Sequence, residues 1–165
     1  MTELYFRNRE VSSEIIDGEN KKEAKEIYRE FKKWRKETYD LPAPNFREVM
    51  NGDCIPDDGE RTNFKFTIVR TSDGRPVGLL IINEKWPEKD ILFIGMMYLS
   101  KDMRGKGIGK SILNSLYDFA GSGYKRLRVR VHKTNEIKPI FFLKNGFKTV
   151  HFLMGNDHIL ERSIN

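Results

Sequence analysis

The stretch that decides the fold is RGKGIGKSIL, residues 104–113. Its glycines alternate with basic and aliphatic residues, and an apolar run typical of a helix begins inside it. A helix start offers unpaired N–H groups and the positive end of the helix dipole, and glycine lets a ligand approach the backbone because it has no Cβ. The stretch therefore predicts either an anion-binding loop between a strand and a helix or a plain glycine-rich turn.

Two common phosphate-binding motifs do not fit this stretch. A P-loop requires a glycine, four further residues and then Gly-Lys followed by Ser or Thr. Gly109, Lys110 and Ser111 match the second half, but Arg104 stands where the first glycine is needed. The Rossmann pattern fails as well, because its third glycine would fall on Lys110 or Ile112. The pattern that remains is Arg-x-x-Gly-x-Gly.

Strand and helix patterns alternate on both sides of the loop. Apolar residues at spacings of three and four predict helices, and short runs rich in β-branched and aromatic residues predict strands. The strands expected are 2–8, 63–71, 76–83, 91–100, 125–132, 147–154 and 158–164, and the helices are 19–40, 44–51, 136–144 and a helix from the loop through Ala120.

These elements predict one α/β (α+β) domain over residues 1–165. The expected architecture is a mixed, mostly antiparallel central sheet of about seven strands flanked by about four helices, in the order β-α-α-β-β-β-α-β-α-β-β. The segment 91–132 should form a right-handed parallel crossover, since a strand, the glycine loop, a helix and a second strand follow one another there.

Composition limits the classes of partner. The net charge of +6 and pI of about 9.4 would attract anions, but acidic residues are interspersed, so a solvated basic surface is the ordinary explanation. Nucleic-acid binding stays a weaker alternative because no recognition motif or aromatic–basic surface is evident. No apolar run is long enough for a membrane span, and no Cys/His spacing predicts a metal site. The single cysteine, Cys54, favours a reducing, cytoplasmic setting.

Two motifs together carry a family resemblance. Arg-x-x-Gly-x-Gly after a buried strand resembles the signature of the GNAT superfamily, the acyl-CoA-dependent N-acyltransferases. Downstream, that family often reads Asn-x-x-Ala-x-x-Leu-Tyr-x-Lys-x-Gly-Phe. The residues at those places here are Asn135, Lys138, Phe141, Phe142, Lys144, Gly146 and Phe147. The resemblance covers residues 62–164, whereas residues 1–61 match only in the order of elements.

The resemblance implies that acetyl-CoA is the cosubstrate. The pantetheine arm would pair with the backbone of Met97 and Leu99, with the Met97 amide facing the thioester oxygen, and Asn135 would contact the arm. Phe142 would contact the cofactor at the position where the family often has a proton-donating tyrosine. The residues implied to bind the diphosphate are Arg104, Gly105, Lys106, Gly107, Ile108, Gly109, Lys110 and Ser111.

The resemblance also implies direct attack of a neutral primary amine on acetyl-CoA within a ternary complex. Where some relatives have a glutamate base, this chain has Arg130, which cannot act as a base and could instead bind a carboxylate or phosphate of the substrate. His132 and Glu84 are the candidate catalytic bases. The acidic loop 52–60 is either a rim that suits a cationic amine, such as a polyamine, an aminoglycoside or a lysine side chain, or a solvated turn.

A second function stays open from the same residues. Phe142 and Arg130 depart from the family pattern, and both would fit a catalytically weak or inactive acyl-CoA-binding regulatory module. The partner expected for the enzyme is a small-molecule or protein amine, with no membrane and no nucleic acid, and homodimer formation is left open.

Overall fold

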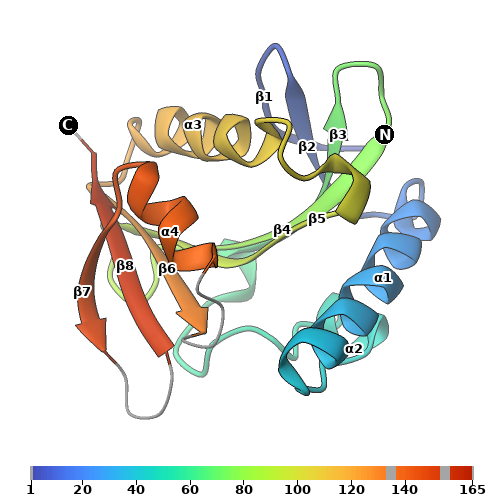
Figure 1. The fold of residues 1–165 in the computed structure, drawn as a ribbon, viewed down its shortest axis with the longest axis horizontal. Helices are drawn as coiled ribbons and strands as arrows, with labels where there is room; N and C mark the ends of the chain where they lie inside the picture. Colours follow the sequence, from blue (N-terminus) through green and yellow to red (C-terminus); the bar gives the residue numbers. More distant parts are fainter. Residues whose placement is uncertain (1, 133–136, 153–156, 165) are drawn as a thin grey trace.

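The structure of the protein, a computed structural model, describes residues 2–132, 137–152 and 157–164. Its strands are β1 (Leu4–Arg7), β2 (Val11–Ile15), β3 (Phe64–Thr71), β4 (Pro76–Glu84), β5 (Ile91–Leu99), β6 (Arg126–His132), β7 (Lys148–Phe152) and β8 (Asp157–Ser163). Its helices are α1 (Lys21–Tyr39), α2 (Phe46–Met50), α3 (Ile108–Ala120) and α4 (Ile137–Lys144), with short 3-10 helices η1 (Arg61–Asn63) and η2 (Lys101–Met103). The strands form one sheet in the order β1-β2-β3-β4-β5-β6-β8-β7. Helices α1 and α2 cover one face, and α3 and α4 cover the other (Figure 1).

This arrangement confirms the predicted mixed, mostly antiparallel fold with four helices. Strands β5 and β6, which precede and follow α3 in the sequence, pair in parallel, as expected for the segment 91–132. The other described neighbours pair antiparallel. The hairpin of β3 and β4 turns at Gly74, whose φ of +88° only glycine adopts without strain.

The sheet has one strand more than the sequence predicted. The chain reverses after β1 at Asn8, whose side-chain oxygen accepts hydrogen bonds from the backbone N–H groups of Glu10 at 2.7 Å and Val11 at 2.9 Å. Strand β2 then pairs with both β1 and β3. Its polar sequence hid it, because the buried hydroxyl of Ser13 is satisfied by Thr67 of β3 at 2.6 Å, a contact that the local pattern cannot reveal.

Side-chain alternation along β4 divides the core into two layers. Leu79 and Ile81 face α1 and α2, whereas Leu80 and Ile82 face α3 and α4. The apolar stripe predicted on the first helix meets the former layer, and α3 meets the latter. Both layers include fully buried side chains from the central strands, so the sheet is covered on its two faces.

The segment between α1 and α2 is fixed by local bonds. Asp40 ends α1 in the left-handed conformation with φ of +54°, and its N–H donates to the Lys36 carbonyl at 2.9 Å. Asn45 caps α2 by accepting from the Glu48 N–H at 2.9 Å. The Tyr28 hydroxyl donates to the Pro44 carbonyl at 2.5 Å, which ties the segment back to α1. The two helices therefore form a defined roof over one face of the sheet.

Candidate active site

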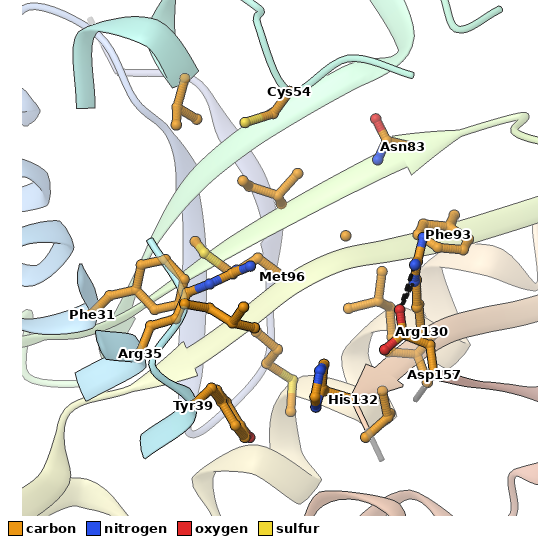
Figure 2. A pocket seen from close by; sticks show the side chains of 18 of the residues that line it. Phe31, Arg35, Tyr39, Cys54, Asn83, Phe93, Met96, Arg130, His132 and Asp157 are labelled. Carbon is orange, nitrogen blue, oxygen red and sulfur yellow. Dashed lines mark hydrogen bonds and ion pairs between the residues drawn. The ribbon is translucent and has the colours of Figure 1, made fainter. Parts of the chain in front are cut away.

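The central feature of the site is a gap where β5 and β6 separate. They pair only from Ile91 with Arg126 to Ile94 with Val129. Beyond that point β5 pairs with β4 alone and β6 pairs with β8 alone. A cavity of about 350 Å³ lies at the point of separation, under α1 and α2. Figure 2 shows this cavity with its lining side chains.

Gly95 sits where β5 bends away. Ile82 pairs with Ile94, and Ile81 pairs with Met96, so Gly95 is an extra residue that forms a β-bulge. A Cβ at Gly95 would lie 3.0 Å from the Asn83 side-chain nitrogen and 3.1 Å from Ile81. Glycine therefore permits the close approach of β4 at the place where β5 leaves β6.

The second half of β5 presents an unpaired backbone edge to the gap. The Ser100 N–H donates to the Val77 carbonyl of β4 at 2.9 Å. Peptide groups alternate in direction along a strand, so the even-numbered residues Met96 and Tyr98 also direct theirs toward β4. By the alternation of an antiparallel pair, Met97 and Leu99 direct theirs the opposite way. The Leu99 carbonyl indeed accepts from the Arg104 Nε at 3.0 Å, across that edge. Met97 also lines the cavity.

The glycine loop lies just beyond this edge. Gly105 and Gly107 have φ values of +74° and +82°, and a Cβ at either would meet nothing within 4 Å, so the space beside both is open. Gly107 is the N-cap of α3, and its carbonyl accepts from the Ser111 N–H at 3.0 Å. The N–H groups of the first helical turn before Ser111 lack an intrahelical acceptor. With the exposed Lys106 and Lys110 beside it, the loop suits an anion.

Arg104 connects the loop to the roof of the cavity. Its guanidinium lies over the rings of Trp34 at 5.4 Å and Tyr98 at 5.3 Å. Glu30 of α1 fixes the same strand end, since its carboxylate accepts from the Tyr98 hydroxyl at 3.1 Å and from the Lys101 N–H at 3.3 Å. The loop, the end of β5 and α1 are therefore held as one unit.

Two other residues predicted for cofactor binding are placed deeper. Ser111 is buried, and its hydroxyl accepts from the Asn8 side chain at 3.0 Å, so it points to the β1–β2 turn and not to the loop. Phe142 is buried against Phe147, with ring centroids 5.2 Å apart, and also lines the cavity. Neighbouring Phe141 lines the cavity too and lies 3.0 Å from where a Cβ on Gly109 would be. Asn135 lies outside the described residues.

His132 and Glu84, the two candidate bases, lie in different places. His132 lines the cavity at the end of β6, packs on the Tyr39 ring at 5.4 Å and stands opposite Asp157 in the register with β8. Glu84 follows Asn83, which lines the cavity, and adjacent residues of a strand point to opposite faces. The Glu84 side chain therefore lies on the α3 face of the sheet. There it accepts from the Tyr124 hydroxyl at 2.6 Å. Only His132 of this pair is brought to the gap.

The acidic loop does not supply a rim of carboxylates. Of residues 52–60, the cavity is lined by Cys54 and by none of the acidic side chains. Asp58 instead accepts from the Trp86 indole N–H at 2.6 Å. Burial raises the pKa of the Cys54 thiol, with Asp53 and Glu48 adding to the effect. The alternative of a solvated turn therefore describes this loop, and Cys54 is a neutral part of the wall.

Sequence reasoning missed four polar residues of the cavity: Asn83, Arg35, Tyr39 and Asp157. The alternation of β4 could have identified Asn83, since it shares a face with Ile81. Arg35 could have been noted from its position four residues after Phe31 on the same helix face. Asp157 could not, because its place depends on the pairing of β8 with β6.

The described residues contain neither a cluster of metal-ligating side chains nor a helix that could span a membrane. Within residues 2–132, 137–152 and 157–164, no three His, Cys, Asp or Glu side chains are grouped as for a metal ion. In the same ranges, no helix has the length and apolar character needed to cross a membrane.

The geometry agrees with what comparison with known proteins shows. The model of the acetyltransferase (GNAT) family matches residues 22–147. The chain therefore belongs to the GNAT family of acetyltransferases, and the resemblance inferred from its two motifs is confirmed. No curated protein sequence matches the chain.

Solved structures with a similar fold share little sequence. RimL, a ribosomal L7/L12 alpha-N-protein acetyltransferase, has a TM-score of 0.76 at 17% identity, with 99% of this chain and 96% of that chain covered. An acetyltransferase from Thermus thermophilus has a TM-score of 0.74 at 17% identity, covering 93% and 96%. Spermidine N-acetyltransferase from Vibrio cholerae, solved with CoA and spermine, has a TM-score of 0.70 at 13% identity, covering 95% and 97%. These structural similarities show that this chain has the same fold as the three proteins.

Proposed function

We propose that this protein moves an acetyl group from acetyl-CoA to a primary amine by direct attack in a ternary complex. The observation that carries the proposal is the unpaired edge of Met97 and Leu99, which runs between the open glycine loop and a cavity. An extended arm can add to such an edge as a strand does, while the loop binds its phosphates and the cavity receives an amine. RimL and the spermidine enzyme, which share the fold, act on amines by their names.

The loop residues fit the diphosphate of acetyl-CoA. Gly105 and Gly107 leave open space where side chains would stand, and the first N–H groups of α3 face outward with the dipole of the helix. Lys106 and Lys110 add positive charge. Arg104 holds the loop against α1 and donates to the Leu99 carbonyl. Ser111 is left out of the proposed site because its hydroxyl belongs to the Asn8 contact.

The chain's own groups then have separate roles in the transfer. Acetyl-CoA supplies an acyl group already activated as a thioester. The Met97 N–H is proposed to donate to the carbonyl oxygen, on which negative charge grows in the transition state. His132, at the far side of the gap, is proposed to accept the proton that the amine loses, directly or through water. Phe142 cannot protonate the departing thiolate, and a thiol with a pKa of about 8.5 leaves without that help.

A catalytically weak acyl-CoA-binding module is the second candidate. The specific observation that favours it is Phe142, which is buried at the position of the family's proton donor. An enzyme and a binding module both predict stabilisation by acetyl-CoA. Only the enzyme predicts release of free thiol when an amine is added.

Two variants test the loop assignment. Gly107→Val places a side chain in the open space, so acetyl-CoA should no longer raise the melting temperature of this variant. ATP and NAD should have little effect on the melting temperature of the wild type or of the variant. Gly74→Val is the matched control, since Gly74 has a similar φ of +88° and equally open space in the β3–β4 turn. It should show the same backbone strain and keep the acetyl-CoA shift. An unchanged shift in Gly107→Val would overturn the loop assignment.

A second pair of variants separates the two candidate bases. His132→Gln should lower kcat by about 100-fold, because it removes the proposed proton acceptor. Glu84→Gln should keep the kcat of the wild type, because Glu84 contacts Tyr124 on the other face of the sheet. The reverse outcome would exclude His132 as the proton acceptor.

A further inference from the structure

Arg35 reaches the cavity without a partner for its charge. It follows Phe31 by one helical turn on α1, and in Figure 2 its guanidinium extends toward Met96. Its Nε is buried and has no hydrogen-bond partner among the residues that the structure describes. Those residues also provide no carboxylate within ion-pair distance of Arg35. A buried donor without an acceptor costs free energy, and more so when it is charged.

The remaining charges in the cavity wall cancel each other. Arg130 and Asp157 form an ion pair, drawn as a dashed line in Figure 2. The acidic residues of the loop 52–60 do not line the cavity. Within the described lining, Arg35 is therefore an uncompensated positive charge. Arg130, which the sequence suggested for binding a substrate carboxylate or phosphate, is already occupied by Asp157.

We propose that the acceptor is a small amine that also carries a carboxylate, and that Arg35 binds this carboxylate. The proposal rests on the proposed function and names the substrate class of the same site. A guanidinium presents a planar fork of N–H groups that matches a carboxylate with two parallel hydrogen bonds. The acid group held at α1 would leave the amine free to face the edge of β5 and His132.

The size and walls of the cavity narrow the class further. A volume of about 350 Å³ is near the lower end of ligand pockets, so the acceptor is small. The wall beside Arg35 is largely apolar, since it includes Phe31 and Met96. An amino acid with an apolar side chain meets the requirements of charge, size and wall chemistry. A polyamine or an aminoglycoside does not meet the charge requirement, because its cations would face Arg35.

Matched acceptors test the proposal with the intact chain. Thiol release from acetyl-CoA would be measured with phenylalanine, with phenylalanine amide, with phosphoethanolamine and with spermidine. The kcat/KM for phenylalanine should exceed that for phenylalanine amide by at least about tenfold. Arg35→Gln should lower kcat/KM for phenylalanine by about 10- to 100-fold, chiefly through KM, and leave the amide unchanged. Lys36→Gln removes a neighbouring exposed charge and should change neither.

The same comparison is repeated as binding, so that a lack of turnover does not hide the answer. Calorimetry with CoA-loaded protein should show that phenylalanine binds to the wild type and to Lys36→Gln, but at least about tenfold more weakly to Arg35→Gln. Equal binding of acid and amide, or an equal loss of both in Arg35→Gln, would overturn the proposal. Preference for phosphoethanolamine over every carboxylate would overturn the carboxylate assignment. Binding of the acid without any thiol release would instead reject the transferase function and retain Arg35 as the acid-binding residue.

Discussion

The two halves of β5 differ in what surrounds them. Leu92–Ile94 is paired on both sides, by β4 and β6, and Leu92 is fully buried there. Met96–Leu99, which follows the bulge at Gly95, is paired only with β4, and its other edge faces the gap. One strand therefore contains a half that holds the sheet together and a half whose peptide groups are available to a ligand. Substitutions in the first half should affect stability, and those in the second should affect activity.

The largest expected effect is that of Met97→Pro. Proline removes the N–H proposed to stabilise the developing charge, so kcat should fall by about 100- to 1,000-fold. That N–H faces the gap, so no bond to β4 is lost, and the melting temperature should fall much less than for a proline in a doubly paired strand. Met97→Ala keeps the N–H and is the control in steady-state kinetics. Normal turnover by the proline variant would remove Met97 from the mechanism.

Leu92→Ala tests the doubly paired half. Loss of its buried side chain should leave a cavity that lowers the free energy of unfolding by about 2–5 kcal/mol, measured by urea denaturation. The kcat of the folded fraction should stay close to that of the wild type. A specific loss of activity at unchanged stability would contradict the distinction between the two halves.

Gly95→Ala tests the boundary between them. The added Cβ would approach Asn83 and Ile81 closely, so the bulge must shift, at a cost of about 1–3 kcal/mol. The KM for the amine should rise severalfold because the same atoms line the cavity. Gly18→Ala is the control, since nothing lies within 4 Å of its Cβ. Binding kinetics that match the control would show that the bulge does not shape the site.

The smallest expected effect is on stability at alkaline pH, through Tyr28 of α1, which lines the cavity. Burial raises the pKa of Tyr28 to about 12 from its ordinary value of 10.0. The neutral phenol is thus favoured in the folded state, so its stabilising effect is complete below about pH 10 and is lost as the pH rises through about 12. Tyr28→Phe should show a shallower fall in unfolding free energy over this range, measured by denaturation at each pH. An identical slope would assign the fall to other groups.

Local signals made most of the sheet and the loop predictable from sequence. The glycine loop, the Asp-Gly turn and the apolar stripe of α1 each depend on neighbours within a few residues, and the structure places all three as expected. Strand β2 was missed because Ser13 needs Thr67, which is distant in the chain, to be satisfied when buried.

The charges of the site depended on long-range pairing and could not be read locally. The sequence suggested Arg130 for binding a carboxylate or phosphate, but β8 brings Asp157 beside it. Arg35 carried no local signal, and only the fold leaves its Nε without a partner among the described residues. Glu84 shows a different limit, since its strand was located correctly but the face of its side chain was not considered. Strand parity, applied to Ile82 and Glu84 together, would have directed it away from the cavity.

The position of the gap within the sheet has a consequence for aggregation. Unpaired strand edges usually lie at the rims of a sheet, where they can recruit other polypeptides. Here the rims are β1 and β7, whereas the edge of Met97 and Leu99 that no strand covers lies well within the strand order, where β5 and β6 separate. Met97 and Leu99 are half-buried, and a strand of a second protein molecule would have to enter the gap beside β6 to pair with them. Placed away from the rims, this edge is less suited to pairing with a second sheet than β1 or β7 would be, while an extended ligand can still add to it.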